Sequence, residues 1–212
     1  MSRFFALLVV LVAAPLSAQT AQSPCPTGPA LAASVASQSD AMPGMAMTSA
    51  GVQVDSARHE IRVTAGPFRV AAMAHETGDM TMMDTPVLRV AWPVAGWVRG
   101  YSVKLCDGDA AKGALLPQAM VHHVGLANYS RRELLYPMVE RLMAVGKETP
   151  GVLLPGGVGV PLDKGDTLGL YSAFHDVDGK TVEHAYVIVT LPWIAATHTR
   201  TMGAFTRSLP SM

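Results

Sequence analysis

Three histidines lie in two apolar segments whose residue types are typical of β-strands. His122 and His123 are adjacent in the segment 118–126, QAMVHHVGL, and His175 ends the run LGLYSAFH. Imidazole is the commonest transition-metal ligand in proteins, and near neutral pH most of it is unprotonated and can donate a lone pair. Three imidazoles with one open coordination position can hold copper or zinc. These three histidines are therefore the candidate metal ligands of the chain.

A regular strand does not bring adjacent side chains together. Consecutive residues of a strand point to opposite faces of the sheet, so His122 and His123 can reach one metal ion only at a twist, a β-bulge or a strand end. Without such a distortion, one ring packs in the core, and the histidines are buried residues satisfied by hydrogen bonds. The spacing alone leaves both interpretations open, a metal site and hydrogen-bonded core histidines.

Methionines gather in two further segments. Three lie close together near the N-terminus, and three more accompany a histidine in HETGDMTMMD; together these residues are Met42, Met45, Met47, His75, Met80, Met82 and Met83. Soft thioether ligands favour Cu(I), so the set is a candidate secondary metal site. The alternatives are a methionine-containing linker and a loop packed by adaptable Met side chains.

Motifs of several other site classes are missing from the sequence. It has no Gly-x-Ser-x-Gly elbow, no Gly-rich phosphate loop ending in Lys-Ser/Thr and no closely spaced cysteine pair for zinc. The 16 basic and 16 acidic residues balance, so no nucleic-acid partner is predicted. We assign no catalytic residue from the sequence.

The N-terminus has the pattern of a secretory signal. Arg3 precedes an apolar run over 4–14 and the small residues up to Ala18, where we expect cleavage. The run is far shorter than the roughly 20 residues that a bilayer requires, so we do not expect an integral membrane protein. The expected location is secreted or periplasmic. Cys25 and Cys106 can pair in such an oxidising compartment, and the alternative is two independent thiols.

Hydrophobic periodicity predicts an all-β fold. Period-two alternation bounded by Gly and Pro gives about eight or nine strands with no βαβ rhythm, which favours an antiparallel β-sandwich or jelly roll. One inserted amphipathic helix is predicted over 131–145, because Ser130 and Glu133 have capping-box spacing and apolar residues follow at helical spacing.

Composition divides the chain into four parts. The signal peptide is expected at 1–18, and a flexible leader rich in Ala, Ser, Pro and Met at 19–49. A single jelly-roll domain is expected at 50–195, followed by a C-terminal tail at 196–212.

Three motifs in the region 97–192 resemble the first copper half-domain of the ascorbate-dependent type II copper monooxygenases. They are the pair His122 and His123, the segment LPGGVG at 154–159, and Phe174 followed by His175. This group contains the peptidylglycine α-hydroxylating and dopamine β-monooxygenases. The resemblance implies a β jelly roll in which the three histidines hold the electron-donating copper, so copper is expected rather than zinc. Adjacent histidines share one ion in that family.

The sequence departs from the full monooxygenases in one respect. Those enzymes carry a second jelly-roll domain with two His and one Met at the oxygen-activating copper, whereas this sequence is too short for two domains. His184, His198 and Met202 do not reproduce the spacing of the second ligand set.

We therefore expect a secreted, single-domain copper-binding protein. Its role would be copper handling or electron transfer, with a redox or copper-transfer protein as partner. One alternative is a copper-dependent oxidoreductase of monooxygenase type that needs a partner or an external electron donor. The other is a metal-free jelly-roll interaction domain.

Overall fold

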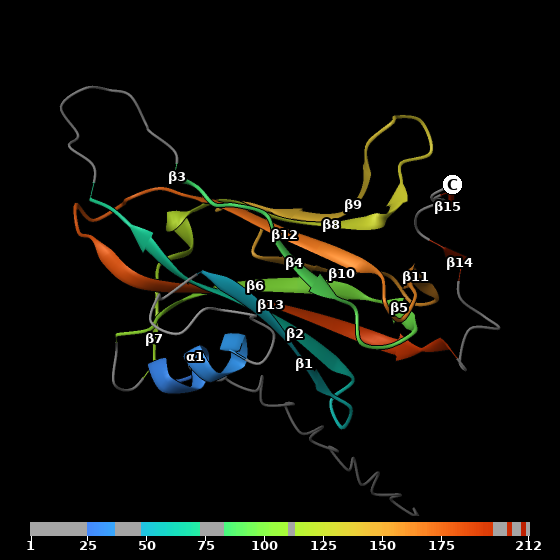
Figure 1. Cartoon of the computed structure of the whole chain (residues 1–212), viewed down its shortest axis with the longest axis horizontal. Helices are drawn as coiled ribbons and strands as arrows, with labels where there is room; N and C mark the ends of the chain where they lie inside the picture. The colour runs from blue at the N-terminus through green and yellow to red at the C-terminus, as the bar shows by residue number, and fades with distance from the viewer. Residues whose placement is uncertain are drawn as a thin grey trace, which may run out of the picture.

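The computed structural model describes residues 25–36, 48–72, 83–109 and 113–196, and the backbone of 203–204 and 209–210. The described residues form two β-sheets that face each other (Figure 1). The described part also contains one α-helix, α1 (Gly28–Ala36), and a 3-10 turn at Gln118–Met120.

The larger sheet has nine strands, in the order β1-β2-β13-β5-β11-β14, with β6, β7 and β10 off this path. Its strands are β1 (Ser49–Asp55), β2 (Glu60–Val70), β5 (Gly96–Val98), β6 (Gly100–Asp107), β7 (Ala114–Leu115), β10 (Gly151–Leu153), β11 (Val158–Leu162), β13 (Val182–Ala195) and β14 (Gly203–Ala204).

The smaller sheet has six strands, in the order β15-β8-β12-β3, with β4 and β9 off this path. Its strands are β3 (Met83–Asp84), β4 (Leu88–Ala91), β8 (Val121–Arg132), β9 (Val139–Val145), β12 (Thr167–Phe174) and β15 (Leu209–Pro210). Among the described strands, β11 with β14 is the one parallel pair. The predicted antiparallel β-sandwich is confirmed, and it has more strands than expected because several contain only two or three residues.

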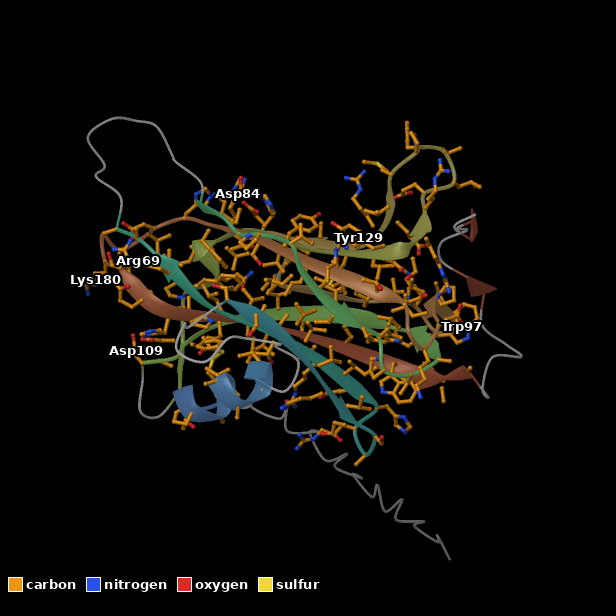
Figure 2. All side chains as sticks on the ribbon, viewed as in Figure 1. Arg69, Asp84, Trp97, Asp109, Tyr129 and Lys180 are labelled. Atoms are coloured by element: carbon orange, nitrogen blue, oxygen red, sulfur yellow. A yellow bond between two sulfur atoms is a disulfide. The ribbon has the colours of Figure 1, made fainter. Side chains whose placement is uncertain are left out.

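Apolar side chains from both sheets fill the space between them (Figure 2). Alternate residues of β13, such as Val187, Val189 and Leu191, are almost fully buried in this core, as period-two alternation predicts. Phe68 of β2 and Phe174 of β12 meet across the two sheets, with their ring centroids 5.6 Å apart. Burial of this apolar surface is the main force that holds the sheets together.

The helix predicted over 131–145 is wrong. The chain continues β8 to Arg132, turns, and returns as β9, which pairs antiparallel with β8. Both residues of the apparent capping box bind elsewhere: the Ser130 hydroxyl accepts the Thr167 N–H at 2.9 Å, and the Glu133 carboxylate accepts the Arg141 N–H at 3.2 Å. Strand pairing overrides the local helical pattern because it satisfies the backbone groups of β8 along its edge.

Residues 25–36 are folded, although they lie within the segment that composition predicted to be a flexible leader. Leu31 and Val35 are buried one helical turn apart and pack against Tyr186 and Ile188 of β13. Those β13 residues alternate with core residues, so α1 covers the face of the larger sheet that points away from the smaller one (Figure 1).

A disulfide bond joins Cys25, just before α1, to Cys106 at the end of β6. Of the two alternatives that the sequence left open, pairing is the one observed. The bond fixes the entry of α1 to the larger sheet across a sequence separation of 81 residues.

The predicted signal peptide at 1–18 lies outside the described residues, and so does most of the predicted tail at 196–212. Two short strands of that tail, β14 and β15, pair with β11 and β8. In the described part of the chain, no helix combines the length and the apolar character needed to cross a membrane.

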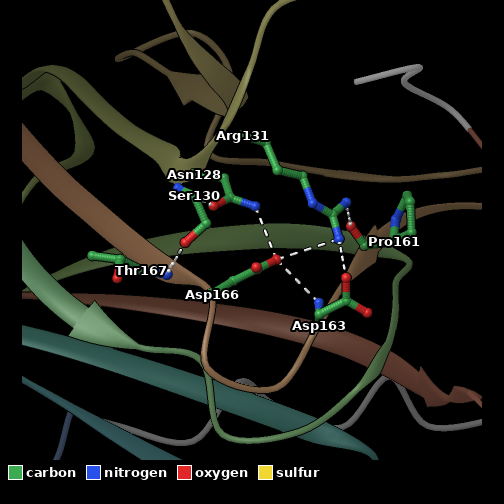
Figure 3. Close-up of polar contacts among 7 residues, drawn as sticks. All are labelled: Asn128, Ser130, Arg131, Pro161, Asp163, Asp166 and Thr167. Atoms are coloured by element: carbon green, nitrogen blue, oxygen red, sulfur yellow. Dashed lines mark hydrogen bonds and ion pairs between the residues drawn. The ribbon is translucent and has the colours of Figure 1, made fainter. Parts of the chain in front are cut away.

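A buried polar network ties β8 to the turn that precedes β12 (Figure 3). Asp166 is 8% exposed. Its carboxylate accepts hydrogen bonds from the Asn128 side chain and the Asp163 N–H, both at 3.0 Å. Arg131 lies 3.5 Å from the same carboxylate and 2.6 Å from that of Asp163. One carboxylate thus sets where β12 begins relative to β8.

Replacing Asp166 with Ala should reduce the free energy of unfolding by about 2 to 3 kcal/mol, because it leaves the buried Asn128 amide without its acceptor and leaves Arg131 with the exposed Asp163 as its one ion-pair partner in the network. Asp163→Ala is the matched control. Its side chain is 77% exposed, so its loss should change stability by less than about 1 kcal/mol. Urea titrations of both variants measure the difference. Equal losses in the two variants would contradict the assignment of Asp166 as the centre of the network.

Candidate metal centre

The two histidine-bearing segments are neighbouring antiparallel strands. In the register of β8 with β12, Tyr171 pairs with Gly125 and Ala173 pairs with His123, but Phe174 then pairs with Val121. The step leaves His122 as one extra residue in β8, which is a β-bulge. The distortion that adjacent histidines require is therefore present at the histidine pair.

The bulge and the end of β12 bring the three imidazole rings together. The ring centroids of His122 and His123 are 5.1 Å apart, and those of His122 and His175 are 4.5 Å apart. His175 follows the last residue of β12, and its N–H donates to the Met120 carbonyl at 2.8 Å. That backbone bond holds the segment of His175 against the start of β8.

The rings are neighbours but do not form a finished coordination site. Among the described residues, no group of three or more His, Cys, Asp or Glu side chains is arranged to hold a metal ion. The nitrogens of His122, His123 and His175 therefore do not converge on one point in this arrangement. Binding of one ion by all three rings would require rotation of the side chains.

Burial favours the neutral, ligand-competent form of His175. Its Nδ1 atom is buried and has no hydrogen-bond partner in the described part of the chain. Burial lowers the pKa of His175 below its ordinary value, and the nearby charges of His122 and Lys147 lower this pKa further. A buried imidazole nitrogen without a partner is unusual, because core polar groups are normally hydrogen-bonded.

Two residues that the sequence interpretation missed support the cluster. The ring of Tyr171 lies beside that of His123, with centroids 5.8 Å apart at 64°. A Cβ atom at Gly125 would overlap the Tyr171 ring, so the absence of a side chain at Gly125 makes room for it. Tyr171 is brought beside His123 by the pairing of β12 with β8. The sequence alone does not give the register of that pairing.

Several other candidate residues are not placed by the structure. The secondary candidates Met42, Met45, Met47, His75, Met80 and Met82 lie outside the described residues, and of Met83 only the backbone is described, paired with Phe174. That second site stays a prediction. His184, which matched no ligand spacing, is half exposed, with its Nδ1 atom 2.7 Å from the Asp109 carboxylate.

Comparisons of the chain with protein-family models, with curated proteins and with solved structures found no match. The functional argument therefore depends on the chemistry and the geometry of the residues themselves.

The lowered pKa of His175 predicts a pH dependence of stability. The unfolded state binds a proton near its ordinary pKa of roughly 6.5, whereas the folded state binds it only at lower pH. Between those values the unfolded state holds more protons, so the free energy of unfolding should fall as pH falls below about 6.5. Urea unfolding of the metal-free protein at pH 8 and pH 5 measures this loss.

Substitution His175→Asn removes the titrating ring, so the loss between pH 8 and pH 5 should be smaller in this variant than in the wild type. Chelator must be present throughout, because metal binding at the cluster would add its own pH dependence. The same pH dependence in both proteins would show that His175 does not contribute.

Proposed function

We propose that the chain is a copper-binding protein, with His122, His123 and His175 as ligands and a role in copper handling or electron transfer. The observation that carries the proposal is three neighbouring imidazole rings at a β-bulge, one of them with a buried nitrogen that has no partner among the described residues. Core histidines retained for packing alone would be expected to satisfy that nitrogen by a hydrogen bond.

The donor set fits copper. Imidazole nitrogen suits both zinc and copper, so the preference for copper comes from the resemblance to the type II copper monooxygenases and from the methionine-rich segments of the sequence. When bound, copper supplies one-electron chemistry. The protein would contribute a fixed spacing of the ligand backbones, a neutral His175 and the ring of Tyr171 beside His123.

A secreted or periplasmic location belongs to the same proposal. The sequence of 1–18 supports it, and so does the Cys25–Cys106 disulfide, because structural disulfides persist mainly in oxidising compartments.

The export proposal predicts that the mature protein begins near Gln19. Expression of the full sequence in a bacterial host, followed by N-terminal sequencing of protein from the periplasmic fraction, measures this. Recovery of an uncleaved chain from the cytoplasm would contradict the proposal.

Substitution of any one ligand should lower the affinity for Cu(I) by at least about 100-fold, since ligand loss should exceed the 10–100-fold typical of outer-shell changes. The variants are His122→Ala, His123→Ala and His175→Ala, and the measurement is competition against a chromophoric Cu(I) chelator. His184→Ala is the matched control, because it removes an exposed imidazole outside the cluster and should retain wild-type affinity.

Copper should also raise the melting temperature of the wild type and of His184→Ala, because it binds the folded state. Unchanged copper content in both His122→Ala and His175→Ala would overturn the proposal in favour of a metal-free domain. Oxygen consumption by the copper-loaded protein with ascorbate would instead identify an oxidoreductase.

A further inference from the structure

An apolar cavity of about 150 Å³ lies between the two sheets, and none of the three candidate ligands lines it. Its inner wall comes from both sheets. Leu126 of β8, Leu162 of β11 and Leu191 of β13 form this wall, and each is at most 2% exposed. The inner end is therefore buried and aliphatic.

The cavity reaches the surface where β9 and β10 form the edges of their sheets. Leu142 of β9 is partly exposed, and Val152 of β10 is 39% exposed, so both lie at the mouth. The hydroxyl of Tyr101, on β6, donates to the Ala144 carbonyl of β9 at 3.3 Å and so bridges the two sheets there. Burial raises the pKa of Tyr101, which keeps its phenol protonated as a donor.

Size and polarity define what such a cavity can bind. A cavity of this volume lined by aliphatic side chains can hold a molecule the size of benzene. Among the described residues that line it, none is charged, and an ionic group buried there would lose its hydration without a partner. The phenol of Tyr101 is the single side-chain hydrogen-bonding group in the described lining.

We propose that this cavity is a binding site for a small neutral molecule with an apolar body, of the class of a single aromatic ring or a short branched alkyl chain. The apolar body would lie against Leu126, Leu162 and Leu191. Tyr101 at the mouth would exchange its bond to Ala144 for one to a polar end of the ligand, where the ligand has one. This site is independent of the histidine cluster and of copper.

The test uses toluene as the probe and the full mature chain. Toluene should raise the melting temperature with increasing concentration, and at ten times its Kd it should raise the folding equilibrium constant about 11-fold. In ¹³C-methyl NMR spectra, toluene should shift the signals of Leu126, Leu142 and Met143, which line the cavity. Benzoate, which has a similar ring but a charge, should produce neither effect.

Val152→Phe places a larger side chain at the mouth and should abolish both toluene effects. Val54→Phe is the matched control, because Val54 has the same exposed fraction, 39%, but lies on β1 and does not line the cavity; it should retain both effects. Leu142→Phe fills the cavity from the opposite sheet, and it replaces Val152→Phe in the test if Val152→Phe does not fold.

The wild-type spectra decide the proposal even if both filling variants fail to fold. Absence of methyl shifts at the lining residues would overturn it, and so would retention of the toluene effects in a folded filling variant. Benzoate binding equal to that of toluene would overturn the assignment of a neutral ligand. Toluene binding that survives in His122→Ala would support the independence of the two sites, and its loss there would overturn that independence.

Discussion

The register between β8 and β12 is the constraint on which the histidine cluster depends. At one end of the pair, the buried Asp166 carboxylate binds Asn128 and fixes where β12 begins against β8. At the other end, the bulge at His122 absorbs one extra residue before Phe174. A slip of one residue would turn His123 to the opposite face of the sheet. The position of the imidazoles is therefore set partly by a polar network at the far end of the same two strands.

On the sheet face that carries His123, two glycines of β8 and β12 are each covered by a tyrosine ring of the neighbouring strand. Tyr171 occupies the space over Gly125, and Tyr129 occupies the space over Gly169. Arg89 of β4 lies over the Tyr129 ring at 4.5 Å, a cation–π contact that extends the layer to a third strand. Glycine weakens a strand because it has no side chain to pack, and a neighbouring aromatic ring compensates by covering the exposed backbone. His122 and His123 are thus held on a well-packed pair of strands, and His175 directly follows the last residue of β12.

The sequence predicted the features that depend on local pattern and missed those that depend on pairing. Alternation in segments such as β6 was enough for the antiparallel sandwich. The adjacency of His122 and His123 indicated that a shared ion needs a twist, a β-bulge or a strand end, and the structure has the bulge. The capping-box spacing of Ser130 and Glu133 led to the wrong prediction of a helix, because that spacing is a local pattern. Their actual hydrogen-bond partners, Thr167 and Arg141, lie on or beside other strands. Helix α1 was missed because only Leu31 and Val35 distinguish it from an Ala- and Ser-rich linker, and the sheet face that they cover was not visible.

The unpaired nitrogen of His175 is a cost to the stability of the fold. A buried polar atom left unpaired costs about 1–3 kcal/mol, and Nδ1 of His175 is such an atom in the described part of the chain. The fold can carry this cost without metal because the core between the sheets and the disulfide to α1 do not involve the histidines. Copper would then add stability to a fold that already exists, unlike the metal of a zinc finger. Substituting His175 by a residue that lacks the unpaired nitrogen would relieve that cost and remove a proposed copper ligand. Functional sites commonly show such a trade-off between stability and activity.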